Sequence, residues 1–411
     1  MPRTLFADVD WLRALSQAHP KAKELLERSD EEQLKRGYFH TLREICQQPK
    51  TWIDTSDQML GAVASLNRCV DGIASLVLTG SGSSEFAGDC VHSPLQNELG
   101  VVAQAIGGGT LLTRGRKAFP PEKPGLMVSL ARSGDSPESV GALTTFLEIE
   151  PELRHLVVSC NDKGGLAQNF CDDPRVTVLT LDDKTNDRSL VMTSSFTNLV
   201  LAARFLGFLD RTTAYRDLCR LLSEVAGGLI ETYFETFSRV ASMPFRRAVF
   251  LGSGSRVSGA REASLKMLEM TAGRVSTMSE TYLGFRHGPM SFAHEDALIV
   301  CFLSSDPTLR AYESDLLREL DRKQLGMSKL IIGEGIPQEV VRENDVLIEC
   351  PGLAQAGDDD AVVVDVVAGQ LLAFFRCLNE GLHPDSPSED GVINRVVQSF
   401  TLHYPARDSQ K

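Results

Sequence analysis

Three charged residues within one predicted helix form the arrangement in this sequence that is best suited to chemistry. Glu262, Lys266 and Glu269 are spaced by four and three residues, which places them on one face of a helix. Such stripes are usually solvated ion pairs. The other residues of this helix are largely apolar and are expected to be buried, namely Ala260, Ala263, Leu265, Met267, Leu268 and Met270. The charges should therefore face an enclosed space, where a carboxylate beside a lysine can serve as an acid or base.

A histidine follows this helix in the stretch SETYLGFRHGPMSF. His287 lies between Arg286 and a Gly-Pro turn, so it is not expected to be part of a packed core. A surface turn residue is the simplest interpretation, but an imidazole can also accept and donate the protons that opening of a sugar ring requires. His287 and His294 have no Asp, Glu or Cys at a zinc-binding spacing, and no HExxH pattern occurs. We therefore expect no metal, and no other cofactor is indicated.

Two loops that follow apolar strands are rich in glycine and hydroxyl groups, TGSGSSE at 79–85 and LARSGDSPES at 130–139. Glycines let backbone N–H groups converge on an anion at the start of a helix, and hydroxyls can donate further hydrogen bonds. Glycine and serine are also common in plain turns and helix caps. The residues that these loops offer for binding a phosphate are Ser81, Gly82, Ser83, Ser84, Arg132, Ser133, Gly134, Ser136 and Ser139.

A second glycine turn, GSGSR at 252–256, makes Gly252 and Ser253 further candidates for substrate binding. The loop that comes later in this half, SSDPTL at 304–309, has fewer hydroxyls than RSGDSPES and lacks its glycine. This divergence favours phosphate binding by the first pair of loops. The first turn lacks the G-x-G-x-x-G spacing of a dinucleotide site, and no G-K-[ST] element of a P-loop is present.

The elements that must position these residues occur twice. The strand SLVLT and its turn GSGSSEFAGD recur 172 residues later as VFL followed by GSGSRVSGAR, and later strands keep this offset approximately. Strands that alternate with helices predict parallel sheets covered by helices on both faces. Ligands of such sheets bind beyond the carboxyl ends of the strands, where both glycine turns lie. The sequence therefore predicts an α/β protein with two tandem domains.

The domain boundaries follow from the same pattern. We expect two short helices in an N-terminal cap and one longer amphipathic helix at about 50–72 that leads into the first strand. The expected parts are the cap at 1–48, a first domain at 49–210, a helical linker at 211–243, a second domain at 244–385 and a tail at 386–411.

Composition limits the partners. A net charge of −13 argues against a general basic surface for nucleic acid or for an anionic membrane. The nine cysteines are scattered without a CxxC pair, which is typical of a reducing compartment and gives little support to cysteine catalysis. The N-terminus does not have the pattern of a signal peptide, and no window approaches the apolar length that spans a bilayer. We therefore expect a soluble, cytoplasmic protein.

Together these stretches resemble the sugar isomerase (SIS) domain family over roughly residues 50–400, in particular the isomerase half of glucosamine-6-phosphate synthase. GSGSRVSGAREASLKMLE is similar to the glycine, Glu, Lys and Glu pattern of that enzyme, RHGP to its histidine loop, and RSGDSPES to its phosphate loop. With GYFHTLREICQQPKTW, MTSSFTNLV and NRVVQ, the whole sequence resembles the tagatose-6-phosphate ketose/aldose isomerase group, whose members are also described as galactosamine-6-phosphate deaminases. The resemblance implies two flavodoxin-like three-layer domains.

The resemblance also implies roles for residues. Glu269 would move a proton between C2 and C1 of the sugar, while Lys266 and Glu262 line the site and the hydroxyl-rich loops hold the phosphate. His287 would open the sugar ring, reaching the site from the neighbouring subunit of a homodimer. The two halves of the chain would thus share one composite site for a phosphosugar.

Two positions depart from the synthase pattern. Ala131 and Arg132 stand where its phosphate loop has Ser and Gln, so the loop exchanges a hydroxyl for a guanidinium. Gln398 falls about where the synthase has a catalytic lysine, which argues against Schiff-base chemistry there but keeps Gln398 as a candidate for substrate binding. Asn394 and Arg395 are expected to help close the site.

The expected reaction releases ammonia. Residue 2 is Pro and only a helical cap precedes the first domain, so we expect no counterpart of the glutaminase that supplies ammonia to the synthase. We expect an amino-hexose 6-phosphate, galactosamine 6-phosphate in the first place, to become tagatose 6-phosphate. Two alternatives stay open: an aldose-ketose isomerase without deamination, and a non-catalytic phosphosugar-sensing regulator, against which the presence of Glu269, Lys266 and His287 argues.

Overall fold

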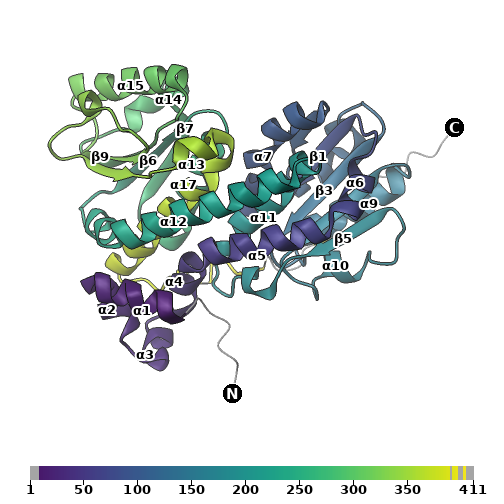
Figure 1. Cartoon of the computed structure of the whole chain (residues 1–411), viewed down its shortest axis with the longest axis horizontal. Coiled ribbons are helices and arrows are strands. Elements are labelled where there is room, and N and C mark those ends of the chain that lie inside the picture. Colours follow the sequence, from purple (N-terminus) through teal and green to yellow (C-terminus); the bar gives the residue numbers. More distant parts are fainter. Residues whose placement is uncertain (1–8, 389–390, 397–400, 404–411) are drawn as a thin grey trace. The chain divides into compact units, whose positions relative to one another are not determined.

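The computed structural model describes residues 9–388, 391–396 and 401–403. The chain forms two compact units, each built around a five-stranded parallel sheet (Figure 1). The first-sheet unit comprises residues 54–186, 198–215 and the described residues from 393 onward. The second-sheet unit comprises the described residues up to 53, together with 187–197 and 216–392. The expected α/β class, with parallel sheets flanked by helices, is confirmed.

The first sheet has the strand order β2-β1-β3-β4-β5. Its strands are β1 (Ser75–Thr79), β2 (Val102–Ala105), β3 (Gly125–Ala131), β4 (Arg154–Ser159) and β5 (Val176–Thr180). Val77 and Leu78 point to opposite faces, because side chains alternate along a strand. Val77 belongs to a core cluster with residues of α8 (Gly108–Arg114) and α9 (Pro137–Ile149), while Leu78 meets α7 (Ser83–Leu99) at Gly88. Helices therefore cover both faces of the sheet.

The second sheet has the order β10-β9-β8-β6-β7, which repeats the order of the first sheet strand for strand. Its strands are β6 (Arg247–Gly252), β7 (Ser276–Thr281), β8 (Ala297–Phe302), β9 (Ser328–Gly333) and β10 (Val346–Glu349). One face packs on α14 (Tyr282–Phe285) and α15 (Pro307–Arg322), and α13 (Arg256–Met270) covers the other. Each strand of both sheets runs parallel to its neighbours.

α17 (Asp358–Asn379) packs along α13. Contact is close because Gly369 has no side chain: a Cβ there would lie 2.4 Å from the Cβ of Ala263. α17 is long and apolar enough to cross a membrane by length and composition, so the expectation that no window approaches that length is wrong. Its apolar window is 94% buried inside the structure, as in the core helix of a soluble protein.

The N-terminal region contains more helices than expected. Instead of two short helices it forms α1 (Val9–Ala18), α2 (Pro20–Leu26), α3 (Asp30–Lys35) and α4 (Phe39–Cys46). Local signals separate them, because Pro20 stands in the first turn of α2 and Ser29 forms a capping box with Glu32 at the start of α3. These helices belong to the second-sheet unit.

The single helix expected at about 50–72 is also divided. The chain leaves helical geometry at Ala62, directly after Gly61, a residue type that weakens helices. The remaining α-helices are α5 (Gln48–Gly61), α6 (Val63–Val70), α10 (Gly165–Gln168), α11 (Ser194–Arg204), α12 (Thr212–Ala241) and α16 (Leu353–Ala356).

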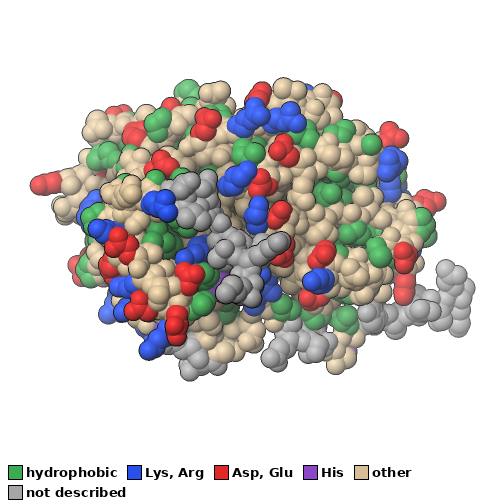
Figure 2. All heavy atoms as spheres, turned by 60° about the horizontal axis from the view of Figure 1, so that its bottom comes forward, with side chains coloured by type: hydrophobic (Ala, Val, Ile, Leu, Met, Phe, Trp, Pro, Cys, Tyr) green, Lys and Arg blue, Asp and Glu red, His purple; other side chains and the backbone are tan. Residues whose placement is uncertain are grey.

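Charged side chains of both signs share the surface. Figure 2 shows one face, on which Lys and Arg side chains are interspersed with Asp and Glu side chains.

A buried carboxylate holds the chain ahead of α11. Glu44 accepts hydrogen bonds from the backbone N–H of Arg188 at 2.6 Å and from the hydroxyl of Ser189. Asp187, also buried, accepts from the N–H groups of Thr193 and Ser195 at the start of α11. Burial, together with the Asp187 carboxylate, raises the pKa of Glu44 to about 8.

This carboxylate should make stability depend on pH. The pKa of Glu44 is about 8 in the folded chain against an ordinary value of 4.5, so the free energy of unfolding falls as pH rises between these values. Glu44→Gln removes the titration, and we expect its thermal midpoint to fall less over this range. Calorimetry across the range checks this, with Glu27→Gln, at a carboxylate that is 61% exposed, as the matched control. An unchanged pH dependence in Glu44→Gln would contradict the assignment.

Candidate active site

Three serine hydroxyls meet at the carboxyl ends of β1 and β3. Ser81 lies in the turn after β1, and Ser136 and Ser139 stand at the start of α9, which follows β3. The Oγ of Ser136 lies 3.0 Å from that of Ser139 and 3.4 Å from that of Ser81, and the Oγ atoms of Ser81 and Ser139 are 3.4 Å apart. The strand order of this sheet reverses between β1 and β3, which is where open parallel sheets bind ligands.

Two helices, α7 and α9, begin beside this hydroxyl cluster and add the partial positive charge of their N-termini. Gly82 caps α7 with a φ of +59°, and Ser83 and Ser84 are buried in the first turn. Gly80 leaves no space for a side chain, because a Cβ there would lie 2.6 Å from the Cβ of Ser84. Hydroxyls and backbone N–H groups at two helix starts form a donor set that suits a phosphate monoester.

Ser133 and Gly134 shape the loop between β3 and α9. The Ser133 hydroxyl accepts a hydrogen bond from the backbone N–H two residues later, at 3.2 Å, and Gly134 has a φ of +73°. The Ser133 carbonyl accepts from the side-chain amide of Asn161 at 2.8 Å, and a Cβ on Gly164 would lie 2.0 Å from the same oxygen. Sequence reasoning missed Asn161 and Gly164; their position just after β4, at the ligand-binding edge of the sheet, was the available signal.

Arg132 contacts the C-terminal segment. Its guanidinium donates a hydrogen bond to the backbone carbonyl of Arg395 at 2.5 Å, and the Arg395 guanidinium donates to Asn186 at 2.7 Å. The described part of this segment therefore contacts the loops after β3 and β5. Gln398, the other candidate in this segment, lies outside the described residues.

In the second-sheet unit, α13 brings together the three charged residues that the sequence marks as candidates for catalysis, Glu262, Lys266 and Glu269. The Nζ of Lys266 lies 3.2 Å from the Glu262 carboxylate and 2.6 Å from that of Glu269. Lys266 and Glu262 are fully buried, whereas the side chain of Glu269 is 24% exposed. Burial alone lowers the pKa of Lys266, but the two carboxylates outweigh burial and hold that pKa above its ordinary value. The result is a protonated lysine that orients an accessible carboxylate.

This carboxylate is far from the glycine turn of its own sheet. α13 begins just after that turn, but Glu269 lies in the last turn of this 15-residue helix, about 20 Å along the axis. Gly252 and Ser253 therefore lie well away from Glu269, and nearness to the strand ends does not account for its position. The expected burial of Leu268 is also wrong, because it is 41% exposed on the last turn of α13.

His287 occupies an exposed turn after α14, where its backbone N–H donates to the Gly284 carbonyl at 2.9 Å. Glu269 precedes β7 in the chain and His287 follows it. The six residues of β7 span about 20 Å at 3.3 Å per residue. Glu269 and His287 thus lie in segments that join opposite ends of one strand.

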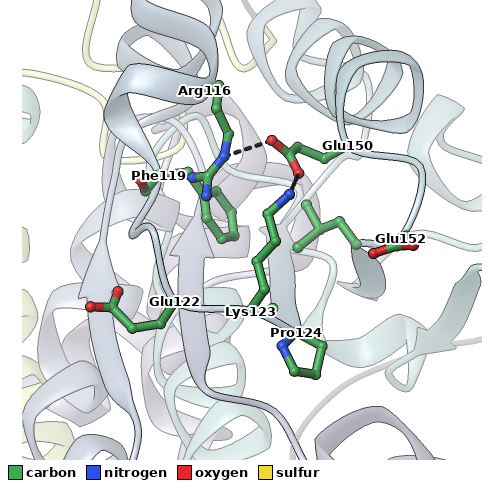
Figure 3. A pocket seen from close by; sticks show the side chains of 9 residues that line it. Arg116, Phe119, Glu122, Lys123, Pro124, Glu150 and Glu152 are labelled. Atoms are coloured by element: carbon green, nitrogen blue, oxygen red, sulfur yellow. Dashed lines mark hydrogen bonds and ion pairs between the residues drawn. The ribbon is translucent and has the colours of Figure 1, made fainter.

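A small pocket at the amino-terminal edge of the first sheet offers a different set of charges (Figure 3). Arg116 and Lys123 both reach Glu150, at 2.6 Å and 2.7 Å, next to Gly125, the first residue of β3. Its volume of about 20 Å³ suits a water molecule rather than a sugar. It also lies at the edge of the sheet opposite to the hydroxyl cluster.

The described residues include possible metal ligands and nine cysteine thiols, and their arrangement and surroundings bear on metal and thiol chemistry. Among these described residues, no three His, Cys, Asp or Glu side chains are grouped so that they could hold a metal ion. All nine cysteines fall within the described residues and none of them is in a disulfide; Cys171 is the exposed one. Burial raises the pKa of Cys46 to about 12, which keeps this thiol protonated and unreactive.

Comparison with known proteins identifies relatives of nearly the full length, although no family model matches the chain. A Streptomyces coelicolor protein, provisionally named D-galactosamine-6-phosphate deaminase AgaS, is 36% identical over 372 residues, covering 89% of this chain and 95% of the relative. The D-galactosamine-6-phosphate deaminase AgaS of Escherichia coli is 32% identical over 373 residues, covering 88% and 95%.

A solved structure is similar to this chain in both fold and sequence. The Clostridium novyi protein provisionally named tagatose-6-phosphate ketose/aldose isomerase matches with a TM-score of 0.87 and 30% identity, covering 92% of this chain and 98% of that chain. The resemblance to the phosphosugar isomerases is thereby confirmed. By identity and coverage, the chain belongs to the AgaS family of D-galactosamine-6-phosphate deaminases, enzymes with the fold of the SIS phosphosugar isomerases.

Proposed function

We propose that the protein converts D-galactosamine 6-phosphate and water into tagatose 6-phosphate and ammonia. The observation that carries the proposal is the accessible Glu269 carboxylate, held 2.6 Å from the buried ammonium of Lys266. The names of the AgaS relatives support the choice of substrate.

The reaction needs one proton to move along the sugar. His287 helps to open the ring, which gives an aldehyde at C1 and an amine at C2. Glu269 removes the C2 proton, and the electron pair forms a C1–C2 double bond as the C1 oxygen takes up a proton. Return of the proton to C1 leaves an imine at C2, which water hydrolyses to the ketone with release of ammonia. One carboxylate can perform both proton transfers, and Lys266 keeps it in place.

The phosphate is assigned to the first-sheet unit. We propose that Ser81, Ser136 and Ser139 donate hydrogen bonds to it, with Ser83 and Ser84 lining the start of α7. Gly82, together with the loop of Arg132, Ser133 and Gly134, would hold the backbone turns after β1 and β3 in the conformation that binds the phosphate. The 3.0–3.4 Å separations between the three hydroxyls and their place at two helix starts support this assignment.

Replacing Ser136 by Asp tests the phosphate assignment. Ser136 is the N-cap of α9, and Asp caps helices as well as Ser does, so the fold should tolerate the change. The added negative charge should repel the phosphate and raise KM for the phosphosugar at least about tenfold, equivalent to about 1.4 kcal/mol. Steady-state kinetics measure this, with the neutral cap Ser136→Asn as the matched control. A KM equal to that of the Asn variant would place the phosphate elsewhere.

A homodimer is proposed from the position of His287. Because the segments that carry His287 and Glu269 join opposite ends of β7, we propose that a second chain brings one of the two side chains to the substrate. The exposure of His287 in its turn is compatible with this role. We also propose a cytoplasmic location, in keeping with nine cysteines of which none is in a disulfide.

We also propose a division of the chain into two tandem domains, a linker and a tail. The shared strand order supports a tandem repeat, with domains at 49–210 and 244–385, a linker at 211–243 and a tail at 386–411 that closes the site. The compact units differ from these boundaries, because the described residues up to 53, residues 187–197 and the linker from 216 onward group with the second sheet.

The activity itself is tested by measuring ammonia and ketose separately after incubation with D-galactosamine 6-phosphate. We expect both products in equal amounts. Ketose formed from an aldohexose 6-phosphate without ammonia would favour the isomerase alternative, which the name of the Clostridium novyi relative supports. Binding of these sugars without any turnover would overturn the enzymatic proposal and favour the sensing alternative.

A further inference from the structure

The turn after β6 corresponds in its sheet to the turn after β1. Each joins a strand at the reversal of strand order to a long helix, α13 or α7. Each also begins with a glycine that has no space for a side chain: a Cβ on Gly252 would lie 2.5 Å from the carbonyl oxygen of Arg256, much as Gly80 meets Ser84. The residue four positions after the glycine differs, because Arg256 replaces the serine.

Three donors of the second-sheet unit converge on one carboxylate of the same unit. Asp358, the first residue of α17, accepts a hydrogen bond from the backbone N–H of Ser305 at 2.9 Å and another from the Ser304 hydroxyl. The Nη1 atom of Arg256 lies 3.7 Å from the same carboxylate. A backbone N–H, a hydroxyl and a guanidinium at the start of a helix are the donors that proteins use for phosphate and sulfate.

We propose that the second sheet contains an anion-binding site whose permanent ligand is the Asp358 carboxylate of the same chain. This inference goes beyond the proposed function and does not depend on it. The carboxylate fills the position, so the wild-type chain takes up no free anion there. The chemical class that fits once Asp358 is removed is a small oxyanion, such as sulfate, inorganic phosphate or acetate.

A second carboxylate strengthens the contrast with the first sheet. Asp306 caps α15 and accepts from the N–H groups of Thr308 and Leu309, whereas the neutral Ser136 caps α9. The helix start next to the Asp358 position is thus already occupied by a side chain. In the first sheet, the corresponding helix start presents hydroxyls that contact one another.

The site should persist when Asp358 is removed, because Arg256 is fixed independently. Its side chain is fully buried and makes two hydrogen bonds to Asp365, at 2.8 Å and 2.6 Å, and a third to the Leu303 carbonyl. Burial alone lowers the pKa of Arg256, but Asp365 outweighs burial, so the guanidinium stays charged. Asp358 is 17% exposed, which leaves a route from solvent to the position.

The test is anion-dependent stabilisation of Asp358→Ala. We expect a lower Tm than in the wild type, and a rise in Tm of several degrees that saturates as sulfate is added, as binding to a defined site requires. Sulfate also stabilises proteins in general, but that effect does not saturate and appears in every variant. Sodium chloride at matched ionic strength gives the baseline.

Two variants serve as controls. Asp359→Ala removes the neighbouring carboxylate, which accepts from the Ser255 hydroxyl at 2.5 Å, and leaves the donors around Asp358 occupied. Asp358→Asn removes the charge but still fills the position. The phosphate loops of the first sheet are intact in every variant and can bind sulfate, so the signal is the additional saturating rise in Tm of Asp358→Ala over the wild type. Neither control should show this additional rise. If Asp358→Ala does not fold in chloride alone, it should fold when sulfate is present throughout purification.

Several results would overturn the proposal. One is a sulfate response of Asp358→Ala that does not saturate or that equals the response of Asp359→Ala. Another is a saturating response of the wild type that is as large as that of Asp358→Ala, which would mean that all of the sulfate binds elsewhere. Asp358→Ser is a milder truncation, and failure of both truncated variants to fold or to gain stability with sulfate would also exclude the site.

Discussion

Glu269→Gln should lower the turnover of galactosamine 6-phosphate by about 10³-fold while leaving the affinity for the sugar nearly unchanged. The amide has the shape of the carboxylate and retains an oxygen that can face Lys266, but it cannot carry a proton from C2 to C1. The loss should therefore appear in kcat rather than in the dissociation constant of the substrate. Stopped assays of ammonia release and calorimetric titration of the inactive variant measure the two quantities.

The matched control for this substitution is Glu262→Gln. Glu262 contacts the same lysine but is fully buried, so its amide should reduce activity far less. Retention of full activity by Glu269→Gln would exclude Glu269 as the base.

Mixing Glu269→Gln with His287→Ala chains examines the proposed dimer as well. A mixed dimer would contain one intact pair of side chains and should regain turnover that neither variant has alone. Without recovery after subunit exchange, His287 would have to act within its own chain or not at all.

Lys266→Met should lower the free energy of unfolding by about 3–5 kcal/mol, the range measured when one partner of a buried ion pair is removed. Methionine matches the stem of the lysine, so the packing of α13 is largely kept. The buried Glu262 carboxylate, however, loses the ammonium that lies 3.2 Å away. Urea unfolding at neutral pH measures the change.

The double variant Glu262→Gln/Lys266→Met separates charge from packing. It removes both buried charges of the fully buried pair, and we expect it to recover most of the lost stability without recovering activity. If Lys266→Met were as stable as the wild type, the ammonium would not be the counter-charge of Glu262. If the double variant were as unstable as the single one, packing rather than charge would explain the loss.

Much of the fold could be predicted because its signals are local. Apolar runs that end in glycine and serine turns marked β1, β3 and β6, and three of the hydroxyls expected to bind phosphate, those of Ser81, Ser136 and Ser139, do meet in the folded chain. β2 and β7 were missed because they are short or partly exposed edge strands, whose sequences VAQA and STMSET lack a continuous apolar run.

The candidate site was harder to predict where the surroundings of a residue depend on other residues that are distant in the sequence. The string GSGS at 252–255 looks like its counterpart at 80–83, which made Gly252 and Ser253 candidates for binding. Their surroundings depend on Arg256 and on Asp358, which lies about a hundred residues later in the chain. No local sequence pattern predicts the contact between Arg256 and Asp358. Likewise, the spacing of Glu262, Lys266 and Glu269 revealed a shared helix face but not which end of α13 would be used.

The two sheets have the same strand order, and in the roles proposed here the second holds a permanently bound carboxylate where the first holds an exchangeable phosphate. A tethered ligand is always present, so the start of α13 is ordered at any concentration of sugar and loses no further entropy when substrate arrives. The loops at β1 and β3, by contrast, would gain and lose their proposed ligand in every catalytic cycle. The order of the loops in the first-sheet unit would therefore depend on the concentration of substrate, whereas the unit that carries Glu269 would stay preorganised at any concentration.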